Sequence, residues 1–207
     1  MFRHLTPAVR WLLLANVGVF ALQWLLPGTL EVRFALWPWH GAERYGMPSF
    51  APWQLISYAY LHGGFEHIFF NMFAVYMFGP ELERLLGARR FNIYYLVCVI
   101  GAAVTQLAVQ ELFSQSVTGP TVGASGGVFG LLLLFGMAYP QRRLMLIFPP
   151  IPMPAWLFVT LYGLAELLMG VFSVLPGIAH FAHLGGMAAG FLLIRYWHAV
   201  SLARRGD

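Results

Sequence analysis

Long apolar stretches, separated by short polar or proline-containing breaks, dominate the sequence. Six of them are predicted to be helices, at about residues 9–26, 58–82, 91–113, 125–139, 155–174 and 178–198. Most approach the ~20 residues that an α-helix needs to cross the hydrocarbon core of a bilayer, and no long alternating strand pattern is present. The pattern predicts an all-α membrane protein that forms one domain over residues 1–207, with six transmembrane helices.

Composition agrees with this prediction. Hydrophobic residues make up 59% of the chain and charged residues 10%, whereas a typical soluble domain carries about 25% charged residues. Since lipid offers no hydrogen-bond partners, polar side chains within the spans are expected to face the interior of the bundle. Cys98 is the single cysteine, so no internal disulfide can form.

The positive charges are unevenly distributed, and all twelve are arginines. With six spans, both termini lie on one side, which collects ten arginines, while only Arg33 and Arg44 lie on the other. The excess of positive charge predicts cytoplasmic N- and C-termini. The second, fourth and sixth spans then run from the outside inward. The basic residues are interpreted as topology signals, so no nucleic-acid partner is expected.

The connection over residues 29–53 is too polar and too rich in proline to cross the membrane. It also contains several aromatic residues, among them Trp37, Trp39 and Trp53. Tryptophan is enriched at membrane–water interfaces. We expect an interfacial loop in the headgroup region, and an ordinary extramembrane loop is the alternative.

The fourth span is short, and a serine stands at its start. About 15 residues give a helix of ~22 Å, less than the ~30 Å hydrocarbon core. Since Arg142 and Arg143 hold its inner end at the cytoplasmic surface, Ser125 should lie below the outer surface. Its neighbours Gly123, Ala124 and Gly126 are small, which leaves the hydroxyl accessible.

Other polar residues are predicted at the same depth. His183 follows the Pro176-Gly177 break by six residues, about 9 Å of helix. His67 lies similarly far from the expected start of its span, with Asn71 one turn deeper on the same face. Glycines and alanines in the fourth and sixth spans, including the Gly186-xxx-Gly190 spacing, predict close contact that brings His183 within hydrogen-bond reach of Ser125.

This set of side chains fits acyl transfer. A serine hydroxyl needs a neighbouring base to become a nucleophile, and the only aspartate, Asp207, lies at the C-terminal end. A Ser125–His183 dyad is therefore the simplest arrangement. His67, Asn71 and the backbone N–H of Ser125 at the helix start are candidate donors to an oxyanion.

These motifs resemble those of the rhomboid intramembrane serine proteases. The resemblance rests on His67-xxx-Asn71, Gly123-x-Ser125-Gly126 and Ala182-His183-xx-Gly186, in that order on the second, fourth and sixth spans, and it covers about residues 9–198. It implies a six-helix rhomboid bundle and an endopeptidase that cleaves transmembrane proteins without a cofactor. It also implies an active site that opens to the extracytoplasmic side, expected here in a prokaryotic inner membrane.

The resemblance also implies roles for single residues. Ser125 would be the nucleophile and His183 the base. The oxyanion and substrate-binding residues would be His67, Asn71, Ala124, Phe70 and Phe129. The fifth span and the loop at 174–177 would control substrate entry. Substrates would be transmembrane proteins with helix-destabilising small residues, in contact with membrane lipids.

The chain departs from the family pattern at two positions. Gln54 follows Trp53 where the family often has arginine, which affects how the first loop is anchored. Phe129 stands where the family often has tyrosine four residues after the serine. Phenylalanine can still stack on the histidine but has no hydroxyl.

Two alternatives and one residue stay open. His62, Glu66, His67, His180 and His183 could bind zinc, although no zinc-protease motif is present, so no metal site is predicted. His62 and Glu66 are expected near the outer surface. A non-catalytic rhomboid-like protein that binds transmembrane clients is the second alternative.

Glu166 in the fifth span lies close to the depth of the polar layer. It is either a structural carboxyl group or a residue that faces the cavity and orients polar groups or water.

Overall fold

The computed structural model describes residues 5–39, 46–113, 119–145, 150–172, 174 and 179–203. The predicted all-α class is confirmed over these residues. The elements, in chain order, are α1 (Pro7–Leu25), α2 (Thr29–Phe34), α3 (Gln54–Ser57), the 3₁₀ turn η3 (Tyr58–Tyr60), α4 (Phe65–Leu86), α5 (Ala88–Phe113), α6 (Ser125–Ala138), the strands β1 (Arg143–Met145) and β2 (Pro152–Pro154), α7 (Ala155–Val171) and α8 (His180–Ala203).

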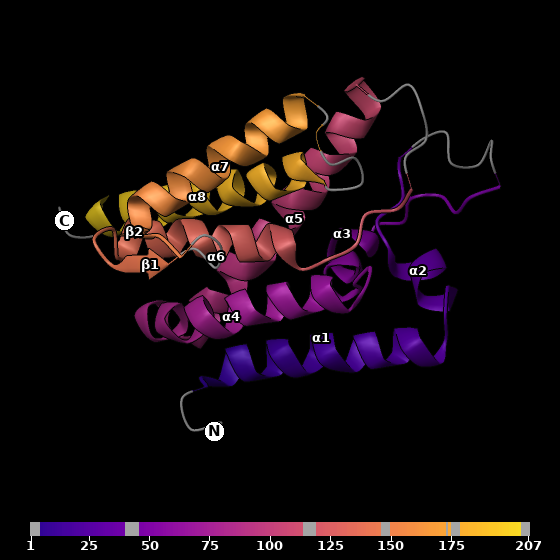
Figure 1. The fold of residues 1–207 in the computed structure, drawn as a ribbon, viewed down its shortest axis with the longest axis horizontal. Helices are drawn as coiled ribbons and strands as arrows, with labels where there is room; N and C mark the ends of the chain where they lie inside the picture. Colours follow the sequence, from indigo (N-terminus) through magenta and orange to yellow (C-terminus); the bar gives the residue numbers. More distant parts are fainter. Residues whose placement is uncertain are drawn as a thin grey trace.

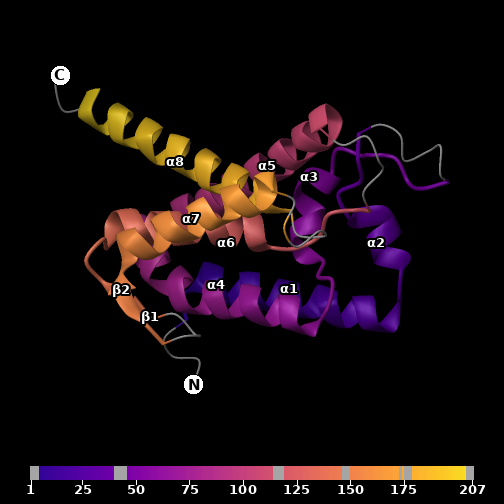
Figure 2. The same ribbon diagram turned by 45° about the horizontal axis from the view of Figure 1, so that its top comes forward.

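Helix α6 lies at the centre of the bundle. It contacts α4, α5, α7 and α8, and the most extensive contact in the fold joins α5 to α8. Helix α1 packs mainly on α4 at the periphery (Figure 1). After a turn of the view, α7 and α8 lie on one side of α6 and α4 with α1 on the other (Figure 2). Helix α6, which begins at Ser125, is therefore enclosed by other helices over much of its length.

Proline and glycine set several helix ends. Pro7 is the first residue of α1, where its missing N–H costs no hydrogen bond. Gly87 ends α4 with φ of 75°, a conformation that side-chain-bearing residues rarely adopt. Beyond α6, β1 and β2 form a short antiparallel hairpin that leads into α7. The central part of that connection, 146–149, lies outside the described residues.

The start of α4 differs from the predicted span. The sequence pattern predicts a helix from about residue 58, whereas α4 begins at Phe65. Residues 58–60 form the 3₁₀ turn, and Leu61 is extended, with φ of −88° and ψ of 149°. Gly63 and Gly64 follow, and glycine favours leaving a helix. Apolarity alone could not reveal this break, because Tyr58–Leu61 is as apolar as the helix.

A buried carboxylate joins α1 to α4. Glu83 is 3% exposed, and its two oxygens accept hydrogen bonds from the backbone N–H groups of Ala8 and Val9 at 3.0 and 2.9 Å. These N–H groups belong to the first turn of α1, where backbone N–H groups have no hydrogen-bond acceptor within the helix. Glu83 thus caps α1 from another helix and fixes the packing of the pair.

Two helices in the described part of the chain have the length and hydropathy of a membrane span. They are Pro7–Leu25, with mean hydropathy 1.4, and Ala88–Leu112, with mean hydropathy 1.7. Helices α6 and α7 are apolar but shorter. On α7 the leucines at 161, 164 and 168 are exposed while Glu166 is buried, the reverse of a soluble helix. The predicted number of crossings and the side of the termini stay predictions.

The predicted contact between the fourth and sixth helices is confirmed. A Cβ atom added to Gly186 would overlap the carbonyl oxygen of Gly126, so the two backbones touch. On α5, Gly101 meets Ala189 and the backbone of Gly185 in the same way. Small residues let three helices approach at backbone distance.

We expect Gly186→Ala to destabilise the protein, because the new methyl group meets backbone rather than a side chain that can move. Overpacking of this kind costs about 1–3 kcal/mol. Thermal unfolding in detergent measures the effect. Gly18→Ala on α1 is the matched control, since a Cβ there has nothing within 4 Å. Equal melting temperatures for the two variants would contradict the packing argument.

Candidate active site

Ser125 is the first residue of α6, and Ala124 is its N-cap. Ala124 is fully buried, whereas Ser125 is partly accessible. The first backbone N–H groups of a helix have no partner within the helix, and they lie at the positive end of its dipole. A hydroxyl at this position can therefore stand next to donors suited to a developing negative charge.

The segment before Ser125 is held by backbone hydrogen bonds. Leu36 and Thr121 form an antiparallel bridge, with N–O distances of 3.0 and 2.9 Å. The N–H of Gly123 donates to the carbonyl of Tyr58 at 3.0 Å. Gly123 has φ of 125°, and a Cβ there would lie 2.6 Å from His67 Nε2. Only glycine fits both the conformation and the space.

His183 Nε2 lies 2.8 Å from Ser125 Oγ. His183 is on the first turn of α8 and is 8% exposed. Its ring stacks on Phe129, one turn after the serine, with centroids 4.2 Å apart and planes 7° apart. Phe129 stacks in turn on Tyr162 of α7, at 5.3 Å and 10°. The imidazole is thus fixed in its plane as well as at its hydrogen bond.

His67 offers a donor near the serine segment. The backbone N–H of Gly63 donates to its Nδ1 at 3.3 Å. A neutral imidazole carries one proton, so that proton lies on Nε2, the atom beside Gly123. Asn71 Nδ2 donates to the carbonyl of His67 at 2.8 Å, which uses one of its two amide hydrogens. Each residue keeps one N–H for another acceptor.

A second cluster continues beyond the serine and histidine. Glu166 Oε2 on α7 lies 2.9 Å from His183 Nδ1 and 2.7 Å from His180 Nδ1. His180 Nε2 lies 2.9 Å from the carbonyl oxygen of Val174. Glu166 and His180 are each 5% exposed. A buried polar chain therefore connects the loop after α7 with Ser125.

Residues 49–199 match the family model described as "Rhomboid domain". The chain belongs to the rhomboid family. Rhomboid family members are integral membrane proteins, which agrees with the many exposed apolar side chains on the helices of this bundle.

Curated rhomboid relatives agree with this assignment. The chain is 31% identical to "Rhomboid protein 1, mitochondrial" of Saccharomyces cerevisiae over 86% of its own length and 49% of the relative. It is 33% identical to "Putative rhomboid protease YdcA" of Bacillus subtilis, over 68% of this chain and 65% of that one. It is 26% identical to "Rhomboid protease GlpG" of Yersinia pestis, over 91% and 61%. The chain thus spans about half to two thirds of these relatives.

The sequence correctly predicts the contact between Ser125 and His183, but it misses part of the cluster around them. From the sequence, His180 is only a candidate zinc ligand and Glu166 only a carboxyl group at a suitable depth. The three-residue spacing of His180 and His183 on one helix face was the available signal. Nothing in the sequence indicates the contact of Tyr162, four residues before Glu166 on α7, with Phe129.

The residues considered as possible zinc ligands are not all in one place. His62 is 3% exposed and packs edge-on against His67, with centroids 5.1 Å apart, so its ring lies inside the protein. Its expected depth near the outer membrane surface stays a prediction. Among the described residues, the atoms close enough to share a metal come from Glu166, His180 and His183, all within 4.8 Å of one another. Hydrogen bonds at 2.7 and 2.9 Å already join them.

Gln54 anchors the first loop where the family often has arginine. It is 2% exposed, and its Oε1 accepts from the N–H groups of Trp37 and Ala51, both at 3.2 Å. Trp53 Nε1 donates to the carbonyl of Arg33 at 3.0 Å. The Gln54 side chain thus anchors the loop through hydrogen bonds to the backbone, without the positive charge of an arginine.

The remaining candidates differ in position. Phe70 on α4 is 53% exposed, so it is free to contact a substrate or lipid. Of the predicted gate at 174–177, only Val174 is described.

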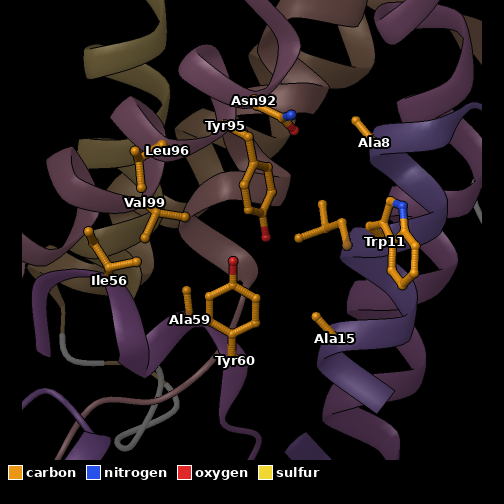
Figure 3. A pocket seen from close by; sticks show the side chains of 11 residues that line it. Ala8, Trp11, Ala15, Ile56, Ala59, Tyr60, Asn92, Tyr95, Leu96 and Val99 are labelled. Atoms are coloured by element: carbon orange, nitrogen blue, oxygen red, sulfur yellow. The ribbon is translucent and has the colours of Figure 1, made fainter. Parts of the chain in front are cut away.

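A separate pocket of about 380 Å³ lies between α1, η3 and α5, away from Ser125. The hydroxyl groups of Tyr60 and Tyr95 point toward each other across it (Figure 3).

We expect Phe129→Ala to slow the reaction of Ser125 with a fluorophosphonate, because the imidazole loses its stacking partner. Aromatic contacts of this kind are worth about 0.5–1.5 kcal/mol, or roughly 2- to 10-fold. Phe129→Tyr should react at the normal rate. Phe158→Ala is the control, since Phe158 stacks on Tyr162 at 5.6 Å rather than on the histidine. Equal slowing by both alanine variants would refute a direct effect on His183.

Proposed function

We propose that this rhomboid protein is an intramembrane serine endopeptidase that cleaves transmembrane proteins with a Ser125–His183 dyad. The 2.8 Å contact between Ser125 Oγ and His183 Nε2 carries the proposal. Two relatives are named as proteases, which supports the same activity here.

The first step is formation of an acyl-enzyme. His183 Nε2 accepts the Ser125 proton as Oγ attacks the carbonyl carbon of the scissile bond. The tetrahedral oxyanion is stabilised by the backbone N–H of Ser125, the Nε2–H of His67 and the free amide hydrogen of Asn71. Collapse breaks the C–N bond, and His183 returns its proton to the leaving amine.

Water completes the cycle. A water molecule attacks the acyl carbon, His183 accepts its proton, and Ser125 leaves with a proton from the same imidazole. Neither step uses a metal ion or an organic cofactor.

The site's position in the membrane defines the substrates. In the proposed topology both termini are cytoplasmic, six helices cross the bilayer, and Ser125 opens to the extracytoplasmic side of a prokaryotic inner membrane. A transmembrane segment must leave its helical conformation to reach the serine. Glycine or proline near the cleaved bond lowers the cost of that change, and Phe70, which is 53% exposed, contacts the unwound segment.

Cleavage of a single-span reporter in proteoliposomes tests the proposal. Wild-type protein should cut it, while Ser125→Ala and His183→Ala should each lower the rate more than about a thousand-fold. Their melting temperatures should stay close to that of the wild type. A wild type that binds the reporter but leaves it intact would instead indicate a non-catalytic client-binding protein.

Covalent labelling and chelation provide a second test of the chemistry. A fluorophosphonate should modify Ser125 in the wild type and leave the His183→Ala variant unmodified, because the hydroxyl then lacks its base. EDTA should not change reporter cleavage. Loss of cleavage on chelation, restored by zinc, would favour the metal hypothesis.

A further inference from the structure

We propose that Glu166 and His180 are positioning residues that set the tautomer of His183, so that the reaction uses a relay of four side chains. The inference rests on the proposed function of Ser125. It concerns which nitrogen of His183 carries the proton before the reaction starts, since only an unprotonated Nε2 can act as a base.

The direction of the relay is set at the carbonyl of Val174. A carbonyl oxygen can only accept, so His180 Nε2, 2.9 Å away, must carry a proton. The 2.7 Å contact between His180 Nδ1 and Glu166 Oε2 then holds exactly one more proton. That proton belongs either to the carboxyl group or to an imidazolium. In both forms the pair has no net charge.

His183 must complete the same network. If Glu166 Oε2 bonds to His180 through this proton, Oε2 has only lone pairs to offer His183 Nδ1 at 2.9 Å. Nδ1 of His183 therefore carries its proton, and Nε2 is free to accept from Ser125 at 2.8 Å. The opposite tautomer would need a proton on Oε2 directed at His183 together with a cationic His180. That leaves a net positive charge in a buried site.

The three side chains of the relay are buried. Glu166, His180 and His183 are 5%, 5% and 8% exposed, so a hydrogen bond lost between them is not readily replaced by one to water. When His183 accepts the serine proton it becomes a cation, and the carboxylate form of Glu166 is then the stabilising neighbour. The shared proton can move fully to His180 at that moment, which supplies the negative charge without any change in the position of the side chains.

The competing explanation is purely structural. Glu166 and His180 also join α7 to α8, where α7 buries few other residues. If Glu166 and His180 only hold α7 to α8, Glu166→Gln should lower activity less than Glu166→Leu, because an amide still forms hydrogen bonds.

The relay predicts the opposite result, with Glu166→Gln lowering activity more than Glu166→Leu. In Glu166→Gln the amide nitrogen can donate to Nδ1 of His180 and Nδ1 of His183 together. His183 then carries its proton on Nε2 and cannot accept from Ser125. An amide in place of the carboxylate in a serine protease triad costs about 10⁴-fold in kcat for this reason. In Glu166→Leu both tautomers of His183 remain accessible.

The experiment compares reporter cleavage by the wild type, Glu166→Gln and Glu166→Leu, corrected for folded protein. We expect kcat to fall at least 100-fold in the Gln variant with little change in KM, and the Leu variant to be at least 10-fold more active than the Gln variant. Glu83→Gln is the matched control. It changes another buried carboxylate, should lower the melting temperature, and should leave cleavage per folded molecule unchanged.

Nitrogen-15 NMR of histidine-labelled protein in micelles reads the tautomer without any substrate. The His183 signals, assigned by their loss in His183→Phe, should report Nδ1–H in the wild type and Nε2–H in Glu166→Gln. A Gln variant more active than the Leu variant, or one that keeps Nδ1–H on His183, overturns the relay. If the Leu variant does not fold, the Gln rate and the spectra decide.

Failure of the proposed function looks different. A wild type that neither cleaves the reporter nor reacts with fluorophosphonate would refute the protease proposal, while the spectra would still test the relay by itself.

Discussion

The contact between α6 and α8 at glycine determines the arrangement of the site. Ser125 begins one helix and His183 lies on the first turn of the other. A serine side chain is short, so it cannot reach a histidine on another helix when the two helices pack at the usual interaxial distance of about 8–10 Å. Because Gly126 and Gly186 bring the backbones into contact, the hydroxyl and the imidazole meet at 2.8 Å. Close packing at glycine thus brings the two polar side chains within hydrogen-bond distance.

Much of this arrangement could be predicted from the sequence because helix geometry converts position into depth. The short apolar run after Ser125 and the break before His183 place both near the same level, and the glycine spacing identifies the facing helices. The start of α4 could not be predicted in this way. Residues 58–61 are apolar and read as helix, yet Gly63 and Gly64 favour a break that only the packed structure reveals.

The cluster of Glu166, His180 and His183 could not be predicted from the sequence for a different reason. The sequence places Glu166 near the right depth, but depth says nothing about which way a side chain points around its helix. Only three-dimensional packing directs Glu166 inward between His180 and His183, while neighbouring leucines of α7 face outward. Similarly, Gln54 looks like the loss of an anchoring charge until its two backbone donors are known.

The bridge between Leu36 and Thr121 connects distant parts of the chain. Its two backbone hydrogen bonds attach the loop after α2 to the segment that precedes Ser125, and Tyr58 holds the same segment through Gly123. The serine is thus mechanically coupled to a region with no chemical role of its own. Any displacement of the loop after α2 is therefore transmitted through backbone hydrogen bonds to the first turn of α6.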